Sequence, residues 1–303
     1  MGHRAAGGDR DGVTAVIDPA AVRAIDVHVH TERTREGHDP MPPVLRSAAA
    51  RYFKSDEPLP TVDDVAAYYR ERDLAAVLFT VDWESRSGIA PIPNEEILDA
   101  AAKNPDVIVP FVSVDPARPD AVERIRRLAA AGARGFKFHP NLQAFFPNDR
   151  DVYPLYEAIA EAGVPALFHS GHSGIGTGVP GGGGLRLKYS NPMCLDDVAA
   201  DFPELPIVLA HPSFPWQDEA ISICLHKENV WIDLSGWSPK YFPPQLVQYA
   251  NTQLRTKVLF GSDFPLITPE RWLADFEQAS FKDEVRPLVL KENAARLLGL
   301  GPS

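Results

Sequence analysis

Short apolar runs alternate with amphipathic stretches along most of this chain. Each apolar run leads into a polar loop and then into a stretch with helical spacing of its apolar residues, closed by Gly, Asn or Pro. The pattern predicts strands at 24–30, 75–82, 107–115, 133–139, 164–169, 206–211, 230–235 and 257–263. It predicts helices at 62–72, 94–103, 118–131, 152–162, 195–202, 216–226, 244–253 and 269–279.

Eight alternating strand and helix units favour one α/β fold, the closed parallel (β/α)8 or TIM barrel, over an open doubly wound sheet. Thr61 precedes an acidic first turn and predicts a helix start. A ninth helical stretch, 283–298, is expected to pack on the outside of the barrel. We expect residues 1–20 to form a flexible N-terminal tail and 21–303 a single barrel domain.

Two connections, 31–60 and 170–192, are longer than ordinary joints between a strand and a helix. Both follow a predicted strand, and the loops after barrel strands form the face that carries the active site. We therefore interpret both segments as binding loops or lids. The alternative is that they are disordered insertions.

Composition and charge exclude several classes of protein. The chain has 303 residues, and 30 basic against 41 acidic side chains give a net charge of −11, which disfavours a nucleic-acid binder. No apolar run approaches the roughly 20 residues that cross a bilayer, and no signal peptide is visible at the start. Two cysteines are too few for a disulfide framework. A cytoplasmic protein without nucleic-acid or membrane partners is the expectation.

The first predicted strand places polar side chains on a barrel face. Alternation along a strand puts Asp26, His28 and His30 on one face, with Val27 and Val29 towards the helices. Two imidazoles in an apolar interior each carry a donor and an acceptor to satisfy, and together they form a pair of nitrogen ligands for a metal. The alternative is that both are structural histidines bonded to backbone carbonyls.

The ends of other predicted strands carry similar side chains. His139, His169, His211 and Asp263 each end an apolar run, and barrel topology brings such positions to one mouth. A divalent ion with an open position explains the set, because it lowers the pKa of bound water from about 15.7 to about 7 and polarises a carbonyl. The predicted ligands are His28, His30, His169 and Asp263.

Nitrogen and carboxylate ligands suit zinc first, with manganese, iron or cobalt as alternatives. His211 is then the candidate general acid and base, or the group that orients the attacking water, and Asp263 is a second candidate for proton transfer. Lys137 is open to three interpretations: carboxylation to bridge a second metal, pairing with a substrate carboxylate, or neutralisation by Asp26 or Asp115. His139 is interpreted as a substrate contact or water-orienting group, as a ligand, or as a packed structural histidine.

The second long connection, 170–192, contains two motifs that match known signatures only in part. The glycines from Gly176 match G-x-G-x-x-G, but four consecutive glycines after a proline do not open a helix. Gly-His-Ser-Gly at 171–174 lacks the last glycine of a nucleophile elbow. The backbone amides of this loop, with Arg186 and Lys188, could grip a phosphate or carboxylate such as that of a coenzyme A thioester; the alternative is a mobile lid.

Two more side chains are candidate substrate contacts. His172 follows a strand end and is read as a substrate contact or as a surface histidine. Trp237 follows another strand, where it lines an aromatic pocket or serves packing.

Several motifs together resemble a known superfamily. They are Asp-Val-His-Val-His at 26–30, Gly-Phe-Lys-Phe-His-Pro at 135–140, His169, His211 with Pro212, Phe-Gly-Ser-Asp-Phe-Pro at 260–265, and Glu-Asn-Ala-Ala-Arg-Leu-Leu at 292–298. Over about residues 22–300 the chain resembles the amidohydrolase superfamily, in particular the amidohydrolase-related branch that includes aminocarboxymuconate-semialdehyde decarboxylase.

The resemblance implies one metal held by His28, His30, His169 and Asp263, with His211 catalytic. The branch includes decarboxylases of aromatic acids, hydratases, lactonases and hydrolases of aromatic β-keto thioesters in hydroxycinnamate breakdown. Several of the decarboxylases have Glu where this chain has His28, which leaves the reaction open.

The leading hypothesis is a metal-dependent hydrolase of a small organic acid or acyl thioester, including C–C cleavage of an aromatic β-ketoacyl-CoA. The second is a metal-dependent decarboxylase of an aromatic or muconate-type acid. The third is an inactive barrel used for binding. The expected partner is the small-molecule substrate, and a homodimer is compatible with the sequence.

Overall fold

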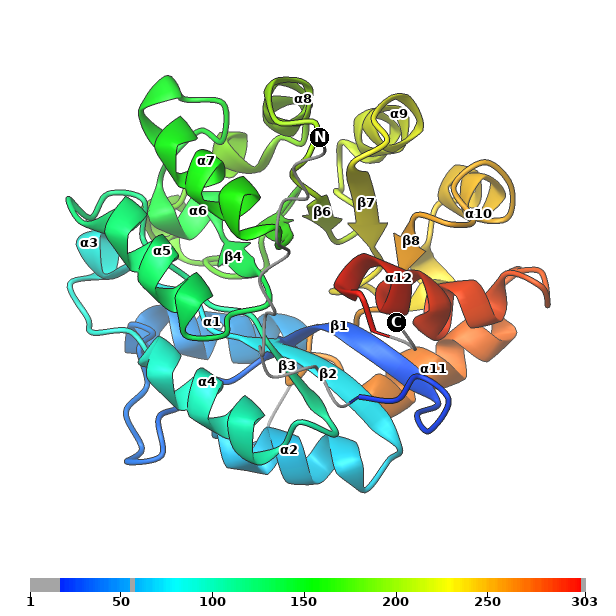
Figure 1. Ribbon diagram of the computed structural model, residues 1–303, viewed down its shortest axis with the longest axis horizontal. Helices are drawn as coiled ribbons and strands as arrows, with labels where there is room; N and C mark the ends of the chain where they lie inside the picture. Colours follow the sequence, from blue (N-terminus) through cyan, green and yellow to red (C-terminus); the bar gives the residue numbers. More distant parts are fainter. Residues whose placement is uncertain (1–16, 55–57, 301–303) are drawn as a thin grey trace, which may run out of the picture.

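Parallel strands form a central barrel in this protein, whose computed structural model describes residues 17–54 and 58–300 (Figure 1). Within that part of the chain the strands are β1 (Ala24–His30), β2 (Leu74–Phe79), β3 (Ile108–Pro110), β4 (Phe136–Phe138), β5 (Ala166–His169), β6 (Ile207–Ala210), β7 (Val230–Asp233) and β8 (Val258–Leu259). Each lies inside, or within one residue of, a predicted run. The paired strand segments are shorter than the predicted apolar runs, because the last residues of most runs leave the sheet and enter the face that carries the active site.

Two seams close the barrel. The ladders form one sheet of β1, β2 and β3 and another of β4 to β8. A parallel bridge between Val112 and Phe136 joins the sheets at one seam, and one between Val29 and Phe264 joins them at the other. At the second seam the His30 amide donates to the Phe264 carbonyl at 2.8 Å. The predicted closed barrel is therefore confirmed, and the open sheet is excluded.

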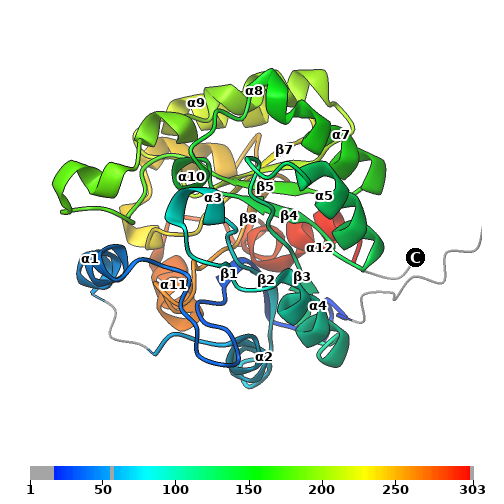
Figure 2. The ribbon, with the colours of Figure 1, turned by 90° about the vertical axis from the view of Figure 1, so that its left-hand side faces the viewer.

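A layer of helices surrounds the strands (Figures 1 and 2). Its members are α2 (Val62–Arg70), α4 (Asn94–Lys103), α5 (Ala121–Ala130), α7 (Tyr153–Ala162), α8 (Met193–Asp201), α9 (Gln217–His226), α10 (Pro244–Ala250) and α11 (Pro269–Gln278). All eight occupy predicted positions. Their apolar faces and the outward side chains of the strands share one large buried cluster, which includes Tyr69, Phe136 and Trp272. No helix within 17–54 and 58–300 is long and apolar enough to cross a membrane.

The start of α2 shows how local sequence sets an element. The Thr61 hydroxyl accepts from the Asp64 amide at 3.3 Å, and the Asp64 carboxylate accepts from the Thr61 amide at 2.9 Å. This capping box satisfies backbone donors that the first turn leaves without helical partners. The predicted helix start is confirmed.

Thr61→Ala is expected to lower the free energy of unfolding by about 1 kcal/mol, because the first-turn amides lose their acceptor. Urea unfolding followed by circular dichroism measures this. The matched control is Thr256→Ala, an exposed threonine that caps none of the described helices, and it should leave the midpoint unchanged. Equal effects of the two substitutions would contradict the capping role.

The C-terminal helical stretch packs on the outside of the barrel, as predicted, only in its first half, where Val285 and Val289 belong to the large outer cluster. It forms a π-helical turn, η5 (Leu288–Glu292), and α12 (Asn293–Leu298). Ala294 and Leu298 share a buried cluster with the inward residues Ile25 and Leu167. In Figure 2, α12 lies across the strands from α1 (Pro43–Phe53). For α12 the prediction was wrong, because its small and apolar residues plug the barrel end opposite the histidines.

A β-bulge in β1 makes part of the predicted alternation wrong. Asp26 pairs with Ala76 and Val29 with Leu78, so three steps along β1 match two along β2. Val27 therefore lies in the inner cluster, whereas the Asp26 carboxylate accepts from the Tyr69 hydroxyl of α2 at 2.8 Å. Asp26 and His28 do not share a face, because the extra residue reverses the pleat.

The two long loops pack on each other at the active face. The first contains α1; the second contains the 3-10 turns η2 (Pro180–Gly184) and η3 (Leu187–Ser190). Leu45 of α1 shares a small buried cluster with Trp83 and Leu142, against which Ile175 of the second loop packs. A Cβ on Gly174 would lie 2.5 Å from the Phe53 ring, so a larger residue at this contact would displace that ring.

Residues 1–16, most of the expected flexible tail, lie outside the described part of the chain. Ile17 is already buried in the inner cluster, so packing begins slightly before the expected boundary at residue 21.

Candidate active site

A cavity of about 350 Å³ opens between the two long loops and ends at the carboxyl ends of the strands. Its lining includes every predicted catalytic and metal-binding residue: His28, His30, His169, His211 and Asp263. The convergence follows from barrel topology, because parallel strands deliver their carboxyl ends to one rim.

His28, His30 and Asp263 form the tightest group at the cavity floor. Their potential ligand atoms all lie within 4.8 Å of one another. One carboxylate oxygen of Asp263, Oδ1, is 3.3 Å from Nε2 of His28 and 3.3 Å from Nε2 of His30. His169 lines the same cavity but does not belong to this group. Three of the four predicted ligands are therefore close neighbours, and the role of His169 as a ligand stays a prediction.

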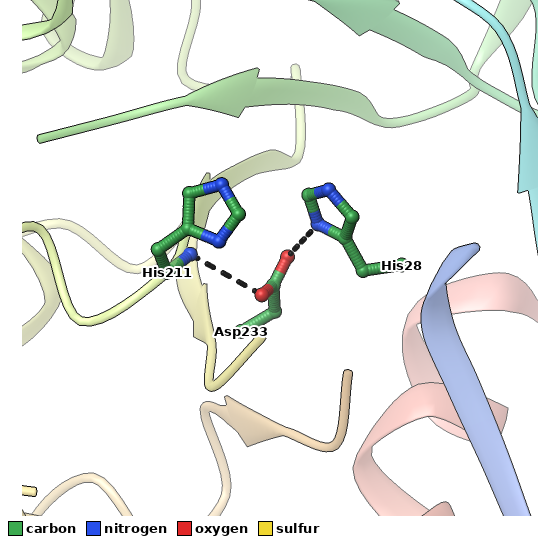
Figure 3. Close-up of side chains that lie close together, drawn as sticks. All are labelled: His28, His211 and Asp233. Carbon is green, nitrogen blue, oxygen red and sulfur yellow. Dashed lines mark hydrogen bonds and ion pairs between the residues drawn. The ribbon is translucent and has the colours of Figure 1, made fainter. Parts of the chain in front are cut away.

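Asp233 at the end of β7 connects the histidines of two strands (Figure 3). Its carboxylate accepts from Nδ1 of His28 at 3.0 Å and from the backbone amide of His211 at 3.2 Å. These bonds account for the closeness of His28, His211 and Asp233 without an ion between them. They also leave Nε2 as the free nitrogen of His28, and Nε2 is the atom that faces Asp263.

Sequence reasoning missed Asp233 and Ser235. A signal was present, because Asp233-Leu234-Ser235 ends a predicted strand and alternation turns both polar side chains to one side. The Ser235 hydroxyl contacts Nδ1 of His211 at 2.8 Å, and it also donates to the Asp233 carboxylate. Nε2 of His211 in turn lies 3.0 Å from Nδ1 of His169.

Burial keeps these imidazoles uncharged at neutral pH. It lowers the pKa of His28 to about 3, aided by the nearby Lys137 and opposed by Asp233. Burial likewise lowers the pKa of His169 far below its usual range, and that of His211 below it. Neutral imidazoles have the lone pair that a metal ligand or general base requires.

The two carboxylates stay ionised despite burial. Burial opposes ionisation of Asp263, but the hydrogen bond with His30 and the nearby histidines hold its pKa below its usual range. For Asp233, burial is again outweighed by its interactions with His28, which hold its pKa low. The imidazoles carry no charge and the two buried carboxylates are negative, so positive charge beside them is stabilised.

Strained backbone marks the same residues. His211 has φ of 71° and Asp263 has φ of 74°, a left-handed conformation that residues with a Cβ rarely adopt. Gly236 shares this region, with φ of 72°, and a Cβ there would lie 2.7 Å from Nδ1 of His211. Such strain persists only where surrounding structure holds it, and here it turns both side chains into the cavity.

Lys137 and His139 enter the cavity from strand β4 and its end. Nζ of Lys137 lies 3.2 Å from Nε2 of His28, and burial lowers the pKa of Lys137 to about 7 against the opposing effect of Asp233 and Asp263. Neither Asp26 nor Asp115 pairs with it, which removes one of its three interpretations. His139 stacks on His169 with ring centroids 3.9 Å apart.

The predicted substrate contacts divide into two groups. His172 and Trp237 line the cavity mouth, with Tyr52 of α1 6.0 Å from the His172 ring. Arg186 and Lys188 are exposed and are not among the lining residues. The geometry therefore gives those two cations no contact with the cavity.

The site fits a divalent cation on two observations. With Nδ1–H of His28 donating to Asp233, the Nε2 lone pair of His28 faces an Asp263 oxygen at 3.3 Å. Two such acceptors are stabilised by positive charge, which Lys137 supplies from 3.2 Å and which a divalent ion would also supply. Nε2 of His169 is buried and has no hydrogen-bond partner among the described residues. An unpaired buried nitrogen in a polar cavity is what a missing ligand contact leaves.

Zinc added to the chelator-treated chain is expected to stabilise it. Free metal at 100 times the dissociation constant should raise the free energy of unfolding by about 2.7 kcal/mol, because the ion binds only the folded site. Thermal unfolding, with metal content measured in parallel, tests this. Zinc, manganese, cobalt and iron(II) all leaving the transition unmoved would contradict a metal centre.

Comparison with known proteins identifies the family. A family model described as amidohydrolase matches residues 25–300. The chain belongs to the amidohydrolase family. The resemblance predicted from the motifs, including that to the amidohydrolase-related branch, is confirmed, and the chain is an enzyme of this superfamily.

A curated relative and several solved structures are similar to this amidohydrolase. Protein FluG of Emericella nidulans is 25% identical over 217 residues, which are 67% of this chain but 24% of FluG, so the chain spans about a quarter of that relative. A TIM-barrel protein of Bordetella bronchiseptica has a TM-score of 0.72 at 22% identity, covering 91% of this chain and 98% of its own.

Two further structures have enzymatic names. A probable 2-pyrone-4,6-dicarboxylic acid hydrolase of Acinetobacter baumannii has a TM-score of 0.61 at 19% identity, covering 92% of this chain and 100% of its own. A dihydroxybenzoic acid decarboxylase of Polaromonas, with bound manganese, has a TM-score of 0.62 at 16% identity, covering 93% and 98%. At these identities the likeness shows the barrel fold.

Proposed function

We propose that this amidohydrolase is a metal-dependent hydrolase of a small organic acid. The observation that carries the proposal is the cavity floor, where His28, His30 and Asp263 converge beside His211. The His28 and His211 rings are 4.8 Å apart between centroids, so a group bound at the cation site also faces the candidate base. A divalent ion bound there, zinc first, would polarise a carbonyl and make water more acidic.

The protein's own groups supply proton transfer and orientation. His211 is uncharged, and once its contact with Nδ1 of His169 opens, its Nε2 can take a proton from the attacking water and return it to the leaving group. Asp263 lies against both β1 histidines, where its carboxylate can hold that water in line. Phe79 packs at 5.0 Å from His28 and 4.8 Å from His30, which restricts ring rotation and keeps both nitrogens directed at the cavity.

The cavity size favours a small acid over a thioester. A volume of about 350 Å³ is at the small end for ligand pockets and accommodates a single-ring acid. A coenzyme A thioester would leave its nucleotide outside, and Arg186 and Lys188 do not line the cavity to hold it. Of the lining cations, Arg46 is already paired with Glu32 and Asp39, whereas Arg271 is exposed at the mouth and free of ion pairs within the described residues.

A decarboxylase is the second candidate. The observation that favours it is the aromatic mouth, where Tyr52, Phe53, Trp237 and Tyr241 line the cavity and suit a flat aromatic acid. The Polaromonas neighbour carries a decarboxylase name. In that reaction His211 or Asp263 would protonate the aromatic carbon as carbon dioxide leaves, and no water would be added.

Metal-loaded protein screened against aromatic acids, lactones and β-keto thioesters tests both candidates. The screen is run in oxygen-18 water. Label in a product carboxylate supports hydrolysis, whereas carbon dioxide release without label overturns it in favour of the decarboxylase. No turnover of any class by fully metal-loaded protein would contradict both.

A further inference from the structure

One carboxylate lies at the centre of the histidine network. Asp233 accepts four hydrogen bonds: one oxygen takes Nδ1–H of His28 at 3.0 Å, and the other takes the amides of His211 and Ser235, at 3.2 and 2.9 Å, and the Ser235 hydroxyl. Four donors suit an ionised carboxylate, which is an acceptor only. Figure 3 shows Asp233 between the rings of His28 and His211.

The protonation of successive rings follows from that acceptor. Because the Ser235 proton goes to Asp233, the Ser235 oxygen must accept, and Nδ1 of His211 at 2.8 Å must carry the hydrogen. Nε2 of a neutral His211 then has a lone pair, so Nδ1 of His169 at 3.0 Å must donate to it. The lone pair of His169 is thereby left on Nε2, the buried nitrogen that lacks a partner among the described residues.

The same carboxylate also fixes the ring of His28. Nδ1–H of His28 donates directly to Asp233, and the Nε2 lone pair of His28 faces Asp263 and the Lys137 ammonium, at 3.3 and 3.2 Å. The three roles predicted for His28, His169 and His211 need lone pairs on these Nε2 atoms. A metal ligand's other ring nitrogen is commonly fixed in this way by an outer partner.

We propose that Asp233 is a positioning residue that holds His28 directly, and His211 and His169 through the Ser235 hydroxyl, in the Nδ1–H tautomer. The inference rests on the proposed function and deepens it, because it explains how the candidate ligands His28 and His169 keep their Nε2 lone pairs and why Nε2 of His211, which accepts from His169, is unprotonated. This arrangement serves the proposed hydrolysis, in which His211 needs an unprotonated Nε2 before it takes the proton of water. In a decarboxylation His211 would have to be protonated on Nε2 first.

Two substitutions distinguish the direct bond between Asp233 and His28 from the chain that runs through Ser235 to His211 and His169. Ser235→Ala removes the acceptor for His211 only, so His211 and His169 should change to the Nε2–H tautomer while His28 keeps Nδ1–H. Asp233→Asn instead changes the bond between residue 233 and His28. Three donors orient the new amide oxygen towards Ser235 and His211, and its NH2 group then faces Nδ1 of His28, which must become the acceptor. His28 is therefore expected to change to Nε2–H.

The measurement is a long-range proton–nitrogen-15 correlation of the imidazole rings in the metal-free full chain at neutral pH. Ring signals are assigned from His28→Gln, His169→Gln and His211→Gln. The control is Ser170→Ala, which removes another buried serine hydroxyl, bonded to Ser213 and the Ala210 carbonyl and to no ring. The control should leave all three tautomers unchanged.

Zinc titration gives a second readout. Asp233→Asn is expected to weaken zinc binding about 10- to 100-fold, and Ser170→Ala not at all. Nε2–H signals for His211 or His169 in the unmodified chain, or unchanged signals in Ser235→Ala, would overturn the proposal. Tautomers as expected in a protein that fails the substrate screen would instead leave the proposal standing and contradict the hydrolase.

Discussion

Asp263→Asn is expected to lose most of the protein's affinity for a divalent ion, by more than about 100-fold. Its Oδ1 is 3.3 Å from a nitrogen of each β1 histidine, and it supplies the negative charge of that group. An amide oxygen keeps the shape but loses the charge, and asparagine tolerates the left-handed backbone of position 263. Isothermal titration with zinc, together with metal content after dialysis, measures the loss.

The folded state should survive this substitution. Asp283→Asn, which removes a fully exposed carboxylate, is the matched control and should bind zinc like the unmodified chain. The thermal stabilisation by zinc described above should also disappear in Asp263→Asn. Retention of one tightly bound ion per chain in Asp263→Asn would show that the metal binds elsewhere in the protein.

His211→Asn is expected to lower kcat by about 10²- to 10⁴-fold while the bound metal is retained. His211 does not belong to the close group of His28, His30 and Asp263, so its removal leaves their ligand atoms in place. Asparagine again suits the left-handed φ of 71° at this position. The readouts are kcat on the best substrate from the screen and metal content of the same sample.

His226→Asn, on the exposed end of α9, is the control for loss of an imidazole and should keep full activity. Loss of metal together with activity in His211→Asn would contradict the expected retention of the ion. Unchanged kcat would contradict its assignment as general acid and base.

Local patterns were sufficient for the order of the elements. Apolar runs predicted each strand, and helical spacing with signals such as Thr61 predicted each surrounding helix. They succeeded because strand and helix periods depend on which side of an element meets the core. The tail helix α12 was placed wrongly because periodicity shows that a face is buried but not against which surface.

Local patterns located part of the site. Residues at strand ends are recognisable in a barrel, so His28, His30, His211 and Asp263 could be predicted to converge. The bulge at Val27–His28 was invisible, because one extra residue in a ladder is defined only by the neighbouring strand. Arg186 and Lys188 were predicted to contact the substrate because of their positive charge, but the loop places them outside the cavity lining.

The sequence by itself determined the barrel, the family and the kinds of chemical group at its mouth, because these follow from periodicity and from residue types at strand ends. Only the tertiary structure decided which nitrogen of each histidine faces the cavity. That choice depends on hydrogen bonds that Asp233 and Ser235 form with residues of other strands, more than twenty positions away. Such bonds have no local signature, since donor and acceptor meet only when the strands close into a ring.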